Sequence, residues 1–415
     1  MNDLVSHGGN RMIRIHLAKD KTEYDFHLGT ALKQWLFLLP AFKLAILESY
    51  PMLDKAYSIW ALCSLIILVC IVLMRRIPLK PFLYTLSMVG FCAIYASMTR
   101  VFTPEAFMGS VSQSVRLLLF PFYLLAFRNV NYQSLVNSLS RFFKLLLLLD
   151  AVSVFIDYDG KLQYSLLGLD NTTIFFIIPA LAIIMFNDYS RDEKISKSSI
   201  AIFLLCFIGK LYSLAVSACI AMTVLTIALH VVLSKIRNSV SGFFINPIVM
   251  FGVFVLFTAT VLLLHVTPVL SVILAVIGKD ATMSGRTTIW ALSLASILRK
   301  PIVGYGQACP GSFQNIVGLS IWAKAATHPH NYALELLWST GVIGTYLYLH
   351  VFVDAIRKIY EYRRFKAVGL LSCGFTAFCV LMITDAYIMQ PSIIILCFIC
   401  LHIKELLIQS EPTDE

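Results

Sequence analysis

Long apolar runs alternate with short polar segments along most of the chain. A helix that crosses the hydrocarbon core of a bilayer needs about 20 mostly apolar residues. On that criterion the pattern predicts an all-α integral membrane protein, a polytopic helix bundle of about 12 transmembrane helices. The predicted spans lie near residues 34–50, 56–74, 81–98, 111–127, 143–157, 171–187, 198–211, 213–233, 246–266, 332–353, 367–384 and 388–405.

Composition supports a membrane protein and argues against other classes. Hydrophobic residues make up 59% of the chain and charged residues 13%, whereas soluble domains carry roughly 25% charged residues. The net charge is +10, but the basic residues are dispersed over short loops, so we predict no nucleic-acid partner. The cysteines lie almost all inside apolar runs, and their spacing predicts neither a disulfide framework nor a metal site.

The distribution of Lys and Arg predicts the orientation. If the N-terminus is cytoplasmic, most of the 33 basic residues fall in cytoplasmic segments, as the positive-inside rule requires. Both termini are then cytoplasmic. The predicted divisions are a cytoplasmic segment 1–33, spans one to nine over 34–266, an extracytoplasmic loop 267–331, spans ten to twelve over 332–405 and a cytoplasmic tail 406–415.

The loop 267–331 is too polar to be a span and too long to be a simple connection, so we expect function there. Apolar and hydroxyl residues mix over 287–298, which predicts a helix that lies in the membrane interface or caps the bundle. Pro301 ends this helix, and a turn follows at 304–306.

Four short motifs occur in order across this loop and the next span: G-R-x3-W, P-I-x-G-x-G, H-N-x2-L-E and G-x-I-G. The ordered series resembles the O-antigen polymerase and O-antigen ligase family of bacterial envelope glycan assembly. The residues that carry the resemblance are Gly285, Arg286, Trp290, Pro301, Ile302, Gly304, Gly306, His330, Asn331, Leu334, Glu335, Gly341, Ile343 and Gly344.

The resemblance implies a reaction and its participants. Glycans built on undecaprenyl diphosphate would be transferred, outside the bacterial cytoplasmic membrane, to an acceptor sugar. The enzyme would be a metal-independent glycosyltransferase of the GT-C type, without a cofactor. Expected partners are the lipid-linked glycan donor, the glycan acceptor, membrane lipid, a chain-length regulator and a flippase.

Four residues of the motif are candidates for the chemistry. A hydroxyl nucleophile needs a general base, most often His, and His330 directly precedes a predicted span. Asn331 and Glu335 would share a helix face, where Glu335 could orient the imidazole or an acceptor sugar. Arg286 would contact the diphosphate or, alternatively, anionic lipid headgroups. The bland alternative for His330 is an interfacial helix cap, and His328, outside the motif, is expected to be dispensable.

Further candidates lie outside those four residues. The family often has an arginine near the outer end of a middle span, whereas this chain has Ala218 and its neighbours there. Arg116 and Lys210, both charges at or near membrane depth, are candidates to replace it. Trp290 and Tyr305 are candidates for stacking on sugars. Weaker acidic candidates are Asp150 and Asp385.

Three functions are consistent with these features. The leading hypothesis is a polymerase that joins undecaprenyl-diphosphate-linked repeat units into a cell-surface polysaccharide. The first alternative is a ligase that transfers finished glycan to a lipid core or another acceptor. The second is a polysaccharide transporter or flippase, which predicts paired half-sequences with broken helices; no such repeat is found in the sequence.

Overall fold

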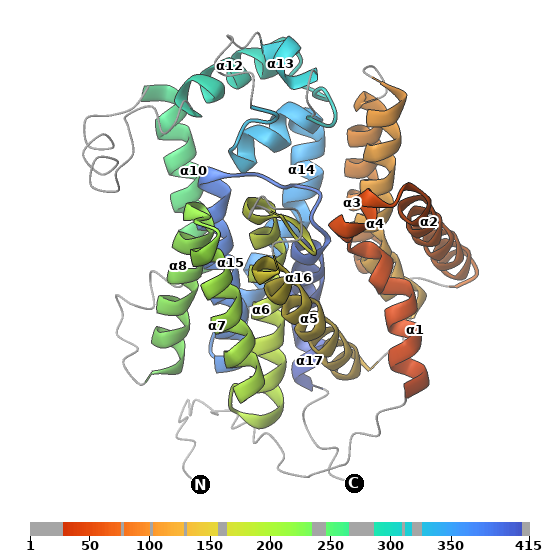
Figure 1. The fold of residues 1–415 in the computed structure, drawn as a ribbon, viewed down its shortest axis with the longest axis vertical. Coiled ribbons are helices and arrows are strands. Elements are labelled where there is room, and N and C mark those ends of the chain that lie inside the picture. Colours follow the sequence, from red (N-terminus) through yellow and green to blue (C-terminus); the bar gives the residue numbers. More distant parts are fainter. Residues whose placement is uncertain are drawn as a thin grey trace, which may run out of the picture.

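The computed structural model describes residues 28–75, 79–99, 103–127, 131–156, 164–234, 246–264, 286–308, 312–317 and 326–408 (Figure 1). The regular secondary structure of this part of the chain is helical apart from one antiparallel pair of two-residue strands, β1 (Tyr164–Ser165) and β2 (Gly168–Leu169). The first residues of the predicted cytoplasmic segment, the last of the tail and part of the 267–331 loop lie outside these ranges, as does Gly285 of the motif.

Among the described residues, six helices are long and apolar enough to cross a membrane. They are α2 (Pro51–Leu73), α3 (Leu79–Thr99), α6 (Asp170–Asp192), α8 (Val216–Leu233), α14 (Tyr332–Glu361) and α15 (Lys366–Thr384). This confirms a multi-pass helical membrane protein, whereas the number twelve and the GT-C architecture stay predictions. Other predicted spans coincide with α4 (Pro104–Ala126), α5 (Tyr132–Phe155), α7 (Lys197–Tyr212), α10 (Pro247–Leu264) and α16 (Pro391–Leu401).

The centre of the bundle is formed by α6 and α16, whose apolar side chains are buried along nearly the whole of both helices. Helices α5 and α15 pack against α6, and α4 and α14 pack against α16. The short α17 (Ile403–Ile408) follows α16 and contacts α5. The burial explains the uniform apolar composition of α16, because a helix surrounded by other helices needs no polar face.

The first predicted span, 34–50, is not one helix. It is divided among α1 (Leu28–Leu38) and two 3-10 turns, η1 (Leu39–Ala41) and η2 (Ala45–Ser49). The hydroxyl of Tyr57 in α2 lies 2.7 Å from the carbonyl oxygen of Leu39 and 2.8 Å from that of Phe42. A side chain on another helix thus donates to carbonyl oxygens that have no partner within a regular helix. Hydropathy alone does not reveal such a partner.

A second break lies inside α14, at Gly341, where φ is 60° and ψ is −165°. The segment 301–306 pairs with the broken helix through its backbone. The bonds are Tyr305 N–H to Trp338 O (2.8 Å), Gly306 N–H to Ser339 O (2.7 Å), Val342 N–H to Pro301 O (2.8 Å) and Ile343 N–H to Ile302 O (3.2 Å). The P-I-x-G-x-G and G-x-I-G motifs are therefore two halves of one backbone junction.

Glycine is required on both sides of this junction. Gly304 has φ of 65°, and a Cβ there would lie 2.5 Å from the carbonyl oxygen of Trp338. A Cβ on Gly341 would collide with the backbone of Ile302. Only glycine combines the left-handed backbone with so close an approach of two chains.

Helices α12 (Arg286–Arg299) and α13 (Ser312–Val317) lie across one end of the bundle, over α10 and α14 (Figure 1). The predicted helix at 287–298 is thus confirmed by α12. A separate hydrophobic cluster, which includes Trp290, Phe313, Leu334 and Trp338, fixes α12 and α13 to α14. We call the end of the bundle that α12 and α13 cover the α12 end.

Candidate functional site

Two histidines precede α14 at the α12 end, on either side of a proline. The second, His330, has a left-handed backbone with φ of 54°, a conformation that is costly for a residue other than glycine. Asn331 holds it there as the N-cap of α14. The Asn331 Oδ1 accepts the N–H groups of Ala333 and Leu334, and its Nδ2 donates to Thr258 Oγ1 (3.3 Å) and to Ile383 O (3.1 Å).

Asp385 brings the two histidines together from the end of α15. Its side chain is buried, and its Oδ1 lies 3.1 Å from Nε2 of His328 and 3.4 Å from Nδ1 of His330. The backbone N–H of Ala386 donates to the same oxygen at 2.9 Å. The centroids of the two imidazole rings are 3.9 Å apart. One carboxylate oxygen thus gathers two imidazoles, and we call these three residues the His–Asp cluster.

The surroundings give the members of the His–Asp cluster different charge states. Burial raises the pKa of Asp385, but its hydrogen bond to His328 and its interaction with His330 outweigh this, and the net pKa lies far below the usual value. Burial lowers the pKa of His330, and the net shift is downward. Burial also lowers the pKa of His328, but Asp385 and the charge of Glu335 reverse the shift. At neutral pH, His330 is therefore the neutral imidazole and Asp385 the ionised carboxylate.

Arg286 and Glu335 flank the cluster with opposite charges. Arg286 is the first residue of α12, and its charge lowers the pKa of both histidines. Glu335 is buried one turn into α14, and its Oε1 accepts a hydrogen bond from Ser339 at 3.1 Å. Its Oε2 has no hydrogen-bond partner among the described residues. The structure thus brings together three predicted residues, His330, Arg286 and Glu335.

The His–Asp cluster has the donor atoms of a metal site. One ligand atom from each of His328, His330 and Asp385 lies within 4.8 Å of the others, and imidazole nitrogens with a carboxylate suit zinc or iron. Two features favour a proton-transfer arrangement instead. Oδ1 of Asp385 is already hydrogen-bonded to His328 and to the backbone N–H of Ala386, and the positive charge of Arg286 acts on the carboxylate.

The structure assigns packing or capping roles to three predicted substrate-binding residues. Trp290 is 2% exposed within the hydrophobic cluster that fixes α12 and α13 to α14, so neither face of its ring is open to a sugar. The hydroxyl of Tyr305 donates to Ser296 O at 2.9 Å, and its ring stacks on Trp338. The amide of Asn331 is used entirely in capping and anchoring α14.

The two remaining predicted cations lie away from the His–Asp cluster. Lys210 is 1% exposed and donates to Thr173 Oγ1 in α6 at 2.6 Å. Arg116 is buried in α4, where its Nη2 donates to Ser58 Oγ at 3.2 Å and its guanidinium lies 5.5 Å from the centroid of the Tyr57 ring. Lys210 therefore serves the packing of α6 and α7, whereas Arg116 faces a cavity.

Two members of the site, His328 and Asp385, are not among the leading candidates from the sequence. His328 was expected to be dispensable because it lies outside the motif, but its Nε2 contacts Asp385 more closely than His330 does. Asp385 was only a weak candidate, since 55 residues separate it from His330. The available signal was an acidic side chain at the outer end of a predicted span, on the same side as the motif.

Comparison with known proteins gives one family match. Residues 201–349 match the family model described as O-Antigen ligase. The match includes the whole motif series and confirms the resemblance to the O-antigen polymerase and ligase family. No curated protein matches the chain. The family indicates a membrane enzyme that transfers glycan from a lipid-linked substrate to an acceptor, of the O-antigen ligase or polymerase type.

Proposed function

Because residues 201–349 match the O-antigen ligase family, we propose that this protein polymerises undecaprenyl-diphosphate-linked oligosaccharide repeat units into a cell-surface polysaccharide. The α12 end would face outward from the bacterial cytoplasmic membrane, with both termini inside. The observation that carries the proposal is the convergence of His330, Asp385 and Arg286 at one end of the bundle. A chain-length regulator and a flippase would be its partners.

In the proposed step, His330 is the general base. Its Nδ1 faces Asp385, which leaves Nε2 to take the proton from an acceptor hydroxyl. The hydroxyl oxygen then forms a bond to the anomeric carbon of the donor glycan. The bond between that carbon and the phosphate oxygen breaks, and undecaprenyl diphosphate leaves with the electron pair. The acceptor proton remains on the imidazole until it passes to solvent.

Asp385 and Arg286 stabilise the charges that this step creates. As His330 becomes an imidazolium, the carboxylate of Asp385 at 3.4 Å offsets its positive charge. On the other side, the departing diphosphate gains negative charge, and the guanidinium of Arg286 can donate two parallel hydrogen bonds to it. Activation resides in the diphosphate leaving group, so these residues suffice without a metal ion.

A ligase is the second candidate, because the matched family model carries that description. The chemistry at the donor is the same, and only the acceptor differs. In a polymerase, the acceptor is another lipid-linked glycan. In a ligase, it is a lipid core or another surface molecule.

An assay with purified protein in detergent tests both candidates. Lipid-linked repeat units alone should be converted to longer lipid-linked chains, with release of undecaprenyl diphosphate. Consumption of donor only after a lipid-core acceptor is added would replace the polymerase by the ligase. Failure to consume donor with either acceptor, together with movement of lipid-linked glycan across proteoliposome membranes, would replace both by transport.

A further inference from the structure

A cavity of about 860 Å³, with charged residues in a mostly apolar lining, lies beside α4 and apart from the His–Asp cluster. Its walls come from the broken segment η1–η2, from α2 and α4, from the β1–β2 hairpin and from the connection between α15 and α16. Irregular backbone at membrane depth is tolerated only where protein covers it or where it lines a hydrophilic space. The irregular backbone of the first predicted span thus lines this cavity, where it is tolerated.

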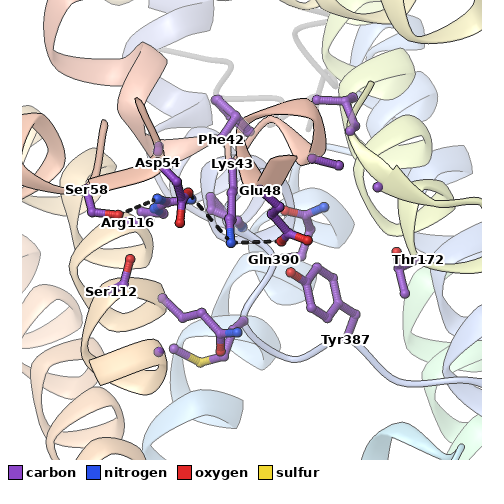
Figure 2. A pocket seen from close by; sticks show the side chains of 18 of the residues that line it. Phe42, Lys43, Glu48, Asp54, Ser58, Ser112, Arg116, Thr172, Tyr387 and Gln390 are labelled. Atoms are coloured by element: carbon purple, nitrogen blue, oxygen red, sulfur yellow. Dashed lines mark hydrogen bonds and ion pairs between the residues drawn. The ribbon is translucent and has the colours of Figure 1, made fainter. Parts of the chain in front are cut away.

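Both signs of charge line this cavity (Figure 2). Lys43 Nζ lies 2.8 Å from Glu48 Oε1 and 3.8 Å from Asp54 Oδ1. Arg116 of α4 lies beside Asp54 and Ser58 of α2 (Figure 2), is 4% exposed, and its Nε has no hydrogen-bond partner among the described residues. The other charged side chains are partly or largely exposed to this space, whereas a buried charge such as Arg116 is costly in a membrane protein and marks a hydrophilic ligand site.

The mixture of charges distinguishes among hydrophilic ligands. Phosphate oxygens only accept hydrogen bonds, so a diphosphate could bond to Lys43, Lys55 and Arg116 but would leave the carboxylates of Glu48 and Asp54 unused. A sugar hydroxyl both donates and accepts, and it can therefore bond to Glu48 and to Arg116 alike. Gln390 and the ring of Tyr387 also line the space, and they offer an amide and an apolar face. Cavities of roughly 300–1,000 Å³ hold small ligands.

The cavity is joined to the His–Asp cluster by one short segment of chain. Asp385 contacts the histidines at the start of the α15–α16 connection, and Tyr387 and Gln390 reach the cavity two and five residues later. From the other side, Gly109 of α4 lines the cavity, and a Cβ there would lie 3.6 Å from Oε1 of Gln307. Gln307 directly follows the P-I-x-G-x-G segment.

We propose that this cavity binds the glycan of the acceptor, not the diphosphate of the donor. This inference rests on the proposed function, because it takes His330 as the base that receives the acceptor proton. The acceptor sugar whose hydroxyl reacts would lie at His330, and the sugars next to it would extend along residues 385–390 into the cavity. Arg286 would then hold the diphosphate, and Arg116 would hold sugar hydroxyls.

A direct binding experiment tests the ligand class. The probes are the oligosaccharide repeat unit, released by mild acid from the lipid-linked pool of the host, and inorganic pyrophosphate. Glu48→Gln and Arg116→Gln should each weaken binding of the oligosaccharide to purified protein roughly tenfold or more, since each removes a hydrogen bond to a charged group. Glu361→Gln is the matched control, because Glu361 forms a comparable ion pair with Lys358 at 2.6 Å outside the cavity.

Two substitutions at Gly109 test the location without removing a charge. An alanine fits, because the nearest atom would be at an ordinary contact distance of 3.6 Å, so Gly109→Ala should bind the oligosaccharide as the wild type does. Gly109→Phe should obstruct the cavity beside α4 and strongly weaken this binding. Melting curves in detergent identify any variant that fails to fold.

The two hypotheses fail in different ways. Loss of oligosaccharide binding in Gly109→Phe, with pyrophosphate binding unchanged, supports the inference. Loss of pyrophosphate binding in Arg116→Gln, with oligosaccharide binding unchanged, overturns it in favour of a diphosphate site. Normal oligosaccharide binding in folded Gly109→Phe also overturns it. If the oligosaccharide binds in the cavity but the purified protein transfers no glycan, the proposed function fails and the binding site stands.

Discussion

The recognised motif divides into two regions that use their residues differently. At the backbone junction, the 301–306 segment and the break at Gly341 contribute main-chain hydrogen bonds and close approach. At the His–Asp cluster, His330 contributes a side chain to a polar group that includes a residue far away in sequence. Both regions look equally distinctive as sequence patterns, yet only the second offers a group that can transfer a proton.

The backbone junction positions the residues of the His–Asp cluster. The junction bends α14 roughly three turns after its N-cap and binds it to the chain that follows α12. Arg286, at the start of α12, is thereby held near the histidines at the start of α14. We therefore expect substitutions at the cluster to act on the rate and substitutions at the junction to act on folding.

The largest expected effect on rate is at His330. A general base contributes roughly 10²- to 10⁴-fold, so His330→Ala should nearly abolish glycan transfer while protein level and melting temperature stay close to those of the wild type. Lipid-linked single repeat units should accumulate in cells. The measurement is turnover of purified lipid-linked donor, with His230→Ala as control, because His230 is exposed at the far end of α8.

His328 is no longer a suitable inert control, since it contacts Asp385. We expect His328→Ala to lose activity too, but less than His330→Ala. If His330→Ala transferred glycan at the wild-type rate, His330 would not be the general base. Loss of wild-type activity in EDTA, with recovery on adding Zn²⁺, would show instead that the cluster binds a metal.

At the junction, Gly341→Ala should destabilise the protein without altering any group of the cluster. The backbone conformation at Gly341 is nearly exclusive to glycine and costs other residues about 1–3 kcal/mol, before the collision with Ile302 is counted. The melting temperature in detergent should fall, along with the amount of folded protein.

Gly252→Ala is the matched control for that substitution. Gly252 lies within α10, and a Cβ there would meet nothing within 4 Å, so alanine should be neutral or stabilising by up to about 1 kcal/mol. A normal melting temperature together with lost activity in Gly341→Ala would place the junction in the catalytic site and erase the contrast between the two regions.

The smallest expected effect is a shift in the pH profile. His330 acts as a base only when neutral, and its pKa is below the ordinary 6.5, so the acid limb of kcat/KM should lie below pH 6.5. Arg286 contributes to lowering that pKa. In Arg286→Gln, the acid limb of the residual activity should therefore shift to higher pH. Arg357→Gln, at the exposed end of α14, should leave the acid limb where it is in the wild type. A limb that moves to lower pH would contradict the proposed role of the Arg286 charge.

Hydropathy and turn residues predicted much of the helical fold. The apolar runs placed α2, α3, α8 and α15 closely, and the mixed pattern at 287–298 together with Pro301 placed α12. The breaks were missed for a physical reason. The 34–50 segment is apolar enough to look continuous, and its irregular backbone is stabilised by groups distant in sequence, namely the Tyr57 hydroxyl and the carbonyl oxygen of Leu166, which accepts the N–H of Ala45 at 2.8 Å.

For the candidate site, sequence identified residues but not their roles. Arg286 and Glu335 lie close enough to the His–Asp cluster to act on it electrostatically, whereas Trp290 and Tyr305 are used in packing and Asn331 in capping. Spacing along the chain is informative for residues on one helix or one turn, because local geometry fixes their distance. It carries no such information for Asp385, which a different helix brings to the same place.

The sequence by itself determined that this chain is a multi-pass helical membrane protein and that its polar segment before α14 resembles one glycan-transferring family. Both follow from local features, namely apolar length and a short ordered motif. Only the tertiary structure decided which motif residues form the backbone junction, that Asp385 joins His328 and His330, and that Arg116 faces a separate cavity. Those outcomes depend on how helices distant in sequence pack together, and packing is set by the whole bundle and not by any single segment.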